Sequence, residues 1–145
     1  MTQPVIISVE GTQKFIGCEK QTVCVVTDGT MRFEGDTIFL SYEESEVTGM
    51  EGTTTTFEVK DNHVVLQRSG AVESRMVFEK GVKDISLYDV GFGAMTIGVK
   101  ARRLKNELGP EGGRLEISYG IEIDQQASGL NSFILDVRKT ENLEQ

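Results

Sequence analysis

Apolar and polar residues alternate one by one along most of this 145-residue chain. Leu115, Ile117 and Tyr119 form one such series, and Glu116 and Ser118 lie between them. Successive side chains on a β-strand point to opposite faces, so the pattern predicts strands with one apolar and one polar face. Comparable runs lie at residues 5–10, 38–43, 57–60, 72–79, 95–102, 114–124 and 132–138.

Residues typical of turns separate these runs. Groups of Gly, Asn, Asp or Pro fall at residues 34–36, 49–52, 61–62, 69–70, 80–81 and 109–113. Gly29 interrupts an extended run, which indicates a bulge or a bend. Residues 101–108 have a helix-forming composition, but a frayed strand end or a single helical turn accounts for them. The chain is therefore expected to form roughly nine or ten strands and no long helix.

Consecutive strands joined by short turns would form an antiparallel meander. The sheet of a meander has two edge strands with unpaired backbone groups, and closure into a barrel pairs them. We therefore predict an all-β fold, with residues 1–145 forming a single antiparallel β-barrel of about eight main strands. A two-sheet sandwich is the alternative; the long runs at 37–49 and 113–124 favour the barrel. Residues 140–145 are expected to form a frayed tail.

Charge and composition exclude several classes of partner. There are 15 Lys and Arg against 23 Asp and Glu, a formal net charge of −8, so nucleic acid and anionic membranes are not expected partners. The N-terminal residues lack the features of a signal peptide, and no apolar stretch approaches the ~20 residues of a membrane helix. A cytoplasmic location is therefore expected, with Cys18 and Cys24 as reduced, buried or half-buried thiols.

No metal or cofactor is expected. The two cysteines do not have the spacing of a metal site, and His63 is the single histidine. His63 is predicted to face outward, whereas a haem ligand would face a dry pocket. No nucleophile–base pair is recognisable, so the chain is not expected to be an enzyme.

Four short motifs occur in a characteristic order. They are Leu40-Ser41-Tyr42-Glu43-Glu44, then Gln67-Arg68-Ser69-Gly70-Ala71-Val72, then Tyr88 with Phe92-Gly93, and last Gly113-Arg114-Leu115-Glu116-Ile117-Ser118-Tyr119. Together they resemble the YwiB-like family of small bacterial proteins of unknown function. The resemblance covers nearly the whole chain and implies a calycin-like (lipocalin-like) β-barrel, but it implies no activity.

Arg68 is the most informative polar residue. By alternation it shares the inward face of Val64 and Leu66, and a buried guanidinium needs a partner or a bound anion. Glu44 and Glu46 share a face with the apolar residues of their run, so one of them, Glu44 in particular, is expected to pair with Arg68 at one mouth of the barrel. The pair either fixes strand register or forms part of a site for a small anionic ligand.

Tyr42 and Tyr119 fall on predicted inward faces, where each hydroxyl needs a hydrogen-bond partner. They either pack in the core or line a ligand cavity. The candidate ligand-binding residues at the barrel mouth are therefore Arg68, Glu44, Tyr42 and Tyr119.

Three classes of function remain open. The first is non-enzymatic binding of a small, anionic or amphipathic ligand inside the barrel. The second is a protein–protein interaction module with a packed lumen, and the third is an enzyme with carboxylates at the barrel mouth. The large inward residues decide between the first two, because they could fill a narrow barrel: Phe57, Met76, Phe78, Met95, Tyr119 and Phe133.

Overall fold

The structure is a computed structural model that describes residues 2–89 and 94–140, and these residues form ten antiparallel strands in one sheet. The strands are β1 (Thr2–Phe15), β2 (Gln21–Glu34), β3 (Thr37–Glu43), β4 (Thr53–Lys60), β5 (His63–Gly70), β6 (Ser74–Glu79), β7 (Lys83–Asp89), β8 (Ala94–Asn106), β9 (Gly112–Ile123) and β10 (Gln126–Lys139). The predicted all-β fold is confirmed, with ten strands rather than about eight.

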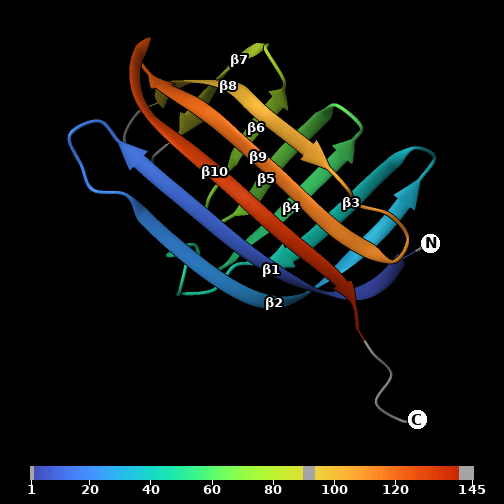
Figure 1. Cartoon of the computed structure of the whole chain (residues 1–145). Helices are drawn as coiled ribbons and strands as arrows, with labels where there is room; N and C mark the ends of the chain where they lie inside the picture. The colour runs from blue at the N-terminus through green and yellow to red at the C-terminus, as the bar shows by residue number, and fades with distance from the viewer. Residues whose placement is uncertain (1, 90–93, 141–145) are drawn as a thin grey trace.

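The sheet curls into a nearly closed barrel. Its strand order is β6-β5-β4-β3-β2-β1-β10-β9-β8-β7, so the first and last strands of the chain pair along their lengths (Figure 1). The two ends of the sheet meet where Lys80 bridges to Ala101, whose carbonyl oxygen accepts a hydrogen bond of 3.1 Å from the Gly81 amide. The barrel prediction is therefore confirmed over the two-sheet alternative.

The interior is packed solid near the β2–β3, β4–β5 and β8–β9 turns. Phe57 and Phe78 are fully buried there, and Phe57 meets Phe133 edge to face with ring centroids 6.0 Å apart. Met76 and Phe133 are half-buried against this core. The large residues thus fill one end of the lumen and leave the other end open. The side chain of Met95 lies outside the described residues.

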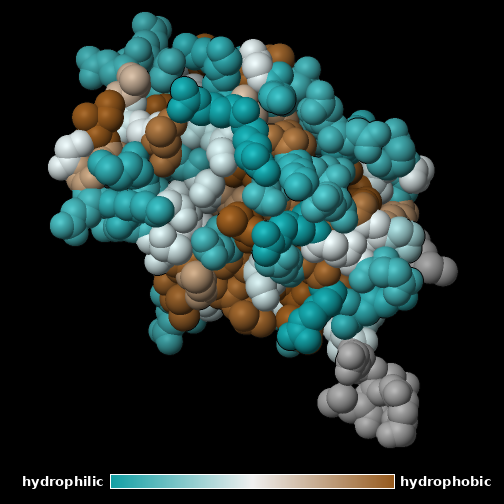
Figure 2. All heavy atoms as spheres, in the orientation of Figure 1, coloured by the Kyte–Doolittle hydropathy of each residue, from teal (hydrophilic) through white to brown (hydrophobic). Residues whose placement is uncertain are grey.

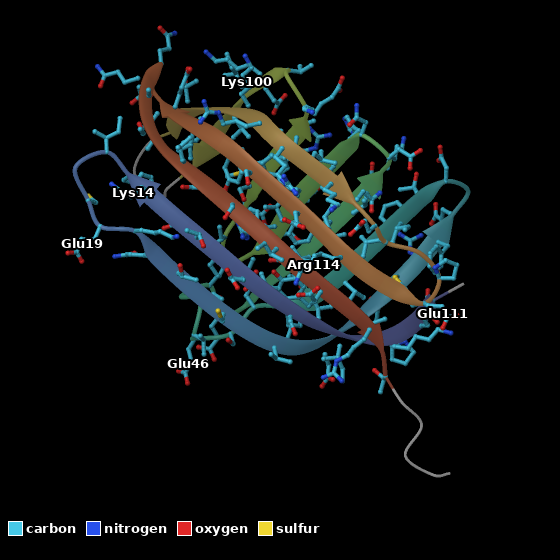
Figure 3. The ribbon with its side chains drawn as sticks, in the orientation of Figure 1. Lys14, Glu19, Glu46, Lys100, Glu111 and Arg114 are labelled. Carbon is cyan, nitrogen blue, oxygen red and sulfur yellow. The ribbon has the colours of Figure 1, made fainter. Side chains whose placement is uncertain are left out.

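The outer face of the barrel carries the polar half of the alternation. Figure 2 shows a mostly hydrophilic surface with smaller hydrophobic areas. Arg114, which is labelled in Figure 3, lies on β9 directly opposite Asp136 on β10, and the two side chains form two hydrogen bonds of 2.8 and 3.2 Å. None of the described residues forms a helix long and apolar enough to cross a membrane.

Two segments differ from the expected strand boundaries. The run 37–49 does not form one long strand, because β3 ends at Glu43 and the chain then turns through residues 45–49. Residues 101–106 are neither frayed nor helical, because β8 continues through them to Asn106 after a register shift between Ala101 and Arg103. A frayed tail was expected at residues 140–145. The Thr140 amide donates to the Pro4 carbonyl at 3.3 Å, and residues 141–145 lie outside the described residues.

Gly29 allows close approach between neighbouring strands. It pairs with Val5 on β1 and with Tyr42 on β3, and neither strand pair has a register shift, so of the predicted bulge or bend the bulge is wrong. A Cβ atom at this position would lie 2.6 Å from both Ile7 Cδ1 and the Ser41 carbonyl oxygen. The glycine is needed because its neighbours occupy the space of a side chain.

Gly29→Ala is expected to destabilise the barrel by about 1–3 kcal/mol, because the Ser41 carbonyl belongs to the β3 backbone and cannot simply rotate away. Urea unfolding would measure the change. Gly11→Ala is the matched control on β1, since its Cβ would meet only the Phe133 ring at an ordinary 3.9 Å. Equal stability of the two variants would contradict the close packing at Gly29.

Both cysteines differ from the expectation of buried or half-buried thiols. Cys18 lies in the turn between β1 and β2, and Cys24 points outward from β2, so both are free and exposed. Alternation explains Cys24, because Val23 and Val25 take the inward positions beside it.

Candidate functional site

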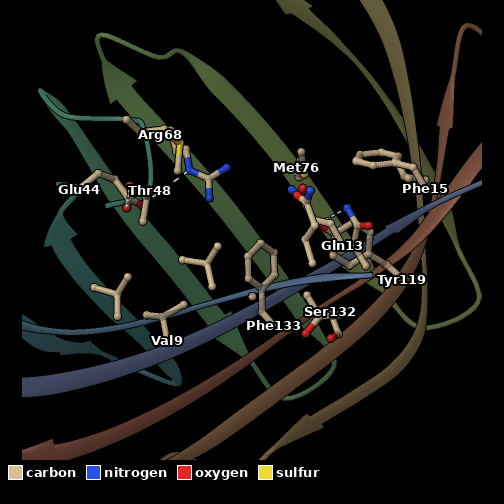
Figure 4. A pocket seen from close by; sticks show the side chains of 18 of the residues that line it. Val9, Gln13, Phe15, Glu44, Thr48, Arg68, Met76, Tyr119, Ser132 and Phe133 are labelled. Carbon is tan, nitrogen blue, oxygen red and sulfur yellow. Dashed lines mark hydrogen bonds and ion pairs between the residues drawn. The ribbon is translucent and has the colours of Figure 1, made fainter. Parts of the chain in front are cut away.

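A cavity of about 500 Å³ lies in the end of the barrel opposite the packed core (Figure 4). This volume is within the range of small-molecule sites. The lining residues are Val9, Gly11, Thr12, Gln13, Phe15, Gln21, Val23, Val25, Tyr42, Glu44, Thr48, Met50, Arg68, Met76, Ile97, Tyr119, Ile121, Asn131, Ser132 and Phe133. The walls are mainly aliphatic and aromatic, and Glu44 and Arg68 are the charged members of the lining.

Glu44 lines this cavity and is the first residue after β3. Its amide donates to the Thr53 carbonyl at 2.9 Å, and only 2% of its side chain is exposed. The Thr48 hydroxyl donates to Oε1 at 3.0 Å, and the Thr55 hydroxyl donates to Oε2. Both carboxylate oxygens therefore have a hydrogen-bond donor, which a buried carboxylate requires.

Arg68 reaches into the cavity from β5, where it lies opposite Thr55 on β4. Its side chain is 12% exposed, and its Nε lies 3.9 Å from Glu44 Oε2, which is an ion-pair distance but too long for a hydrogen bond. Nε is buried and lacks a hydrogen-bond partner among the described residues. Figure 4 shows the guanidinium projecting into the open space beside Glu44 and Thr48.

Tyr42 lies close to this charged pair. The pKa of its hydroxyl is raised above the usual 10.0, first by burial and then by the negative charge of Glu44, while the positive charge of Arg68 opposes the shift. Tyr42 is therefore a neutral hydroxyl at physiological pH, next to the two charges of the cavity.

Tyr119 and Asn131 form a second polar group on the wall made by β9 and β10. The Asn131 Nδ2 donates to the Tyr119 hydroxyl at 3.4 Å, and Asn131 Oδ1 is buried without a partner in the part of the chain that is described. Burial raises the pKa of Tyr119, while the hydrogen bond from Asn131 and the charge of Arg68 oppose the shift. The Tyr119 ring stacks on Phe133, with centroids 5.8 Å apart.

The structure brings together all four residues expected at the barrel mouth. Arg68, Glu44, Tyr42 and Tyr119 all line the one cavity, and Arg68 and Glu44 are within ion-pair distance. Their role in ligand binding stays a prediction. Glu46, the alternative partner for Arg68, is exposed and points away from the barrel (Figure 3), because the chain has left the sheet before this residue.

Three polar residues that form hydrogen bonds with the predicted site residues were themselves not predicted. Thr55 shares the inward face of Phe57 and Val59, and Asn131 shares that of Phe133, so alternation could have identified both. Thr48 lies in a turn, where alternation gives no signal. His63 is not among the residues that line the cavity, and the described residues contain no cluster of His, Cys, Asp and Glu that could hold a metal ion.

Comparison with known proteins identifies the family. The model of a family described as a domain of unknown function, DUF1934, matches residues 7–135. The chain belongs to the DUF1934 family. The uncharacterized beta-barrel protein YwiB of Bacillus subtilis (strain 168) is 26% identical over 109 residues, which are 75% of each chain.

The fold of this DUF1934 member also matches a solved structure. The crystal structure of the YwiB protein from Bacillus subtilis superposes with a TM-score of 0.80 at 19% identity, covering 97% of this chain and 94% of the other. The resemblance to a bacterial β-barrel family of unknown function is therefore confirmed. The calycin-like character that this resemblance implied stays a prediction.

Proposed function

We propose that the protein is a non-enzymatic binder of a small amphipathic molecule with an acidic group. The acidic group lies against Arg68, and the apolar part lies along the wall that includes Val9, Met76 and Phe133. The observation that carries the proposal is a guanidinium that reaches into a mainly apolar cavity of about 500 Å³ and whose buried Nε has no hydrogen-bond partner among the described residues. Cavities of this kind commonly take small molecules, with a few polar groups fixing their orientation.

Glu44 accepts no hydrogen bond from Arg68, so it leaves the N–H groups of Arg68 free for a ligand. Its two oxygens accept from Thr48 and Thr55, and Arg68 approaches no closer than 3.9 Å. A guanidinium carries five N–H donors in a planar fork that suits a carboxylate or phosphate. An acidic ligand would give these donors the hydrogen-bond acceptors that Glu44, at 3.9 Å, does not supply.

The open cavity favours ligand binding over the alternative of an interaction module with a packed lumen. We also propose a structural role for the carboxylate of Glu44, because two threonine hydroxyls donate to it and the guanidinium lies at ion-pair distance. A general acid or base must reach a proton of the substrate, and a carboxylate with both oxygens occupied is poorly suited to that. We therefore propose binding without catalysis.

Calorimetric titration of the purified protein with decanoate and with decanol tests the proposal. Decanoate is expected to bind at least about tenfold more tightly, because a hydrogen bond to a charged group contributes about 1.5–3 kcal/mol. Anilinonaphthalene sulfonate, an anionic amphipathic dye, is expected to fluoresce with the protein and to be displaced by decanoate. If decanoate gives no heat and the dye does not fluoresce with the protein, the proposed function is refuted. If decanol binds as tightly as decanoate, the ligand does not need an acidic group.

A further inference from the structure

Asn131 carries a second unsatisfied polar atom in the same cavity. The residue is 7% exposed, and its Oδ1 is buried without a hydrogen-bond donor among the described residues. It lies on β10, between Gln13 on β1 and Tyr119 on β9. A buried acceptor of this kind is costly to leave unpaired, so its place in the cavity lining needs an explanation.

The neighbours of Asn131 hold its side chain beside Tyr119. The amide nitrogen donates to the Tyr119 hydroxyl at 3.4 Å, which leaves Oδ1 as the end of the amide that has no partner among the described residues. The Tyr119 ring is itself held between Phe78, with centroids 4.8 Å apart, and Phe133, with centroids 5.8 Å apart. The Asn131 amide is thus attached to a well-packed ring, with its oxygen as the unsatisfied end.

Arg68 and Asn131 offer complementary chemistry. Arg68 brings its donors into the cavity from β5. Asn131 lines the same cavity from β10 and carries a buried acceptor that has no donor among the described residues. Figure 4 shows the Arg68 guanidinium and the Tyr119 side chain on separate parts of this space. A ligand that satisfies both anchors needs an acidic group for Arg68 and a hydrogen-bond donor some distance along its apolar part.

The geometry points to a ligand that is an amphipathic carboxylate bearing a hydroxyl or amide N–H, rather than a plain fatty acid. This inference rests on the proposed function and adds the second anchor to it. The acid binds Arg68, and the hydroxyl or N–H donates to Asn131 Oδ1. A site built to hydrogen-bond a ligand discriminates strongly against an analogue that lacks the matching group.

Calorimetry with decanoate and a set of hydroxydecanoates, each hydroxylated at a different carbon, tests the inference. At least one isomer is expected to bind about tenfold more tightly than decanoate. Its O-methyl ether, which has an acceptor but no donor, is expected to lose this gain. The gain is also expected to disappear in Asn131→Leu, while that variant still binds decanoate.

Tyr119→Phe tests whether the hydroxyl that contacts the Asn131 amide contributes to selection of the hydroxylated isomer. This variant retains the Asn131 carbonyl but removes the hydroxyl beside its amide, so it is expected to reduce the ratio between the affinity for the best isomer and the affinity for decanoate. The comparison of isomers on the native protein stands even if a variant fails to fold.

The outcomes distinguish the two proposals. If decanoate binds and no isomer binds more tightly, this inference is overturned, because the Asn131 oxygen then contributes nothing to ligand selection. The proposed function would remain in place. An advantage that survives in the O-methyl ether or in Asn131→Leu would also overturn it. Failure of decanoate and of every isomer to bind would refute the proposed function itself.

Discussion

Arg68→Met is expected to weaken decanoate binding about 10- to 100-fold, because it removes the charged donors from the cavity while keeping a side chain of similar length. Stability is expected to fall by about 1–3 kcal/mol, since Glu44 loses its nearest cation but keeps its two threonine donors. Calorimetry with decanoate and urea unfolding measure the two effects separately.

Arg75→Met is the matched control. Arg75 lies on the neighbouring strand β6 with an exposed side chain, one residue away from the inward position of Met76. The same change of charge there is expected to leave decanoate affinity unchanged. Arg68→Lys keeps the charge but not the planar fork, so its affinity is expected to lie between those of the native protein and Arg68→Met.

This pair of measurements decides between the two roles of Arg68 that the sequence left open. A loss of stability with unchanged affinity would make Arg68 a structural partner of Glu44 and would contradict its role as a ligand anchor. A loss of affinity well beyond that of Arg75→Met would establish the anchor.

Phe57→Ala is expected to destabilise the protein by about 3–5 kcal/mol, which is the usual range for removing a fully buried phenylalanine. Phe57 is 0% exposed and packs against the Phe133 ring at the border between the solid core and the cavity. The substitution would join new empty space to a cavity that already exists, so the surrounding side chains have little means of closing it. The midpoint of urea unfolding would report the loss.

Phe39→Ala is the control for this substitution, since Phe39 lies on the outer face of the adjacent strand β3. It is half-exposed and packs under the Arg32 guanidinium, 4.2 Å from the ring centroid. Its removal is expected to cost about 1 kcal/mol. Similar losses for the two variants would contradict the description of Phe57 as a core residue.

The alternation of apolar and polar residues was sufficient to predict the fold and the face of each principal site residue. Arg68 lies inward because β5 runs without a bulge through Val64 and Leu66. The same rule failed at Glu46, because alternation holds only while the chain remains in a strand and β3 ends at Glu43.

Other features depend on contacts between segments that the sequence does not reveal. The turn that brings Thr48 to Glu44 has no periodic signal, and neither does the approach of Ile7 and Ser41 to Gly29. The contact between the Asn131 amide and the Tyr119 hydroxyl depends on the register that places these two residues opposite each other on β10 and β9. Alternation identifies a face, whereas the partner on that face follows from the register between strands.

The pairing of β1 with β10 also affects how the chain can fold during synthesis. β1 pairs with β2 on one side, but its other edge pairs with β10, in a register that joins Val5 to Lys139. The ribosome releases β1 before β10, so this edge has no native partner until β10 has been synthesised. Such distant pairing slows folding and leaves strand edges exposed to aggregation, and closure of this barrel has to wait for β10.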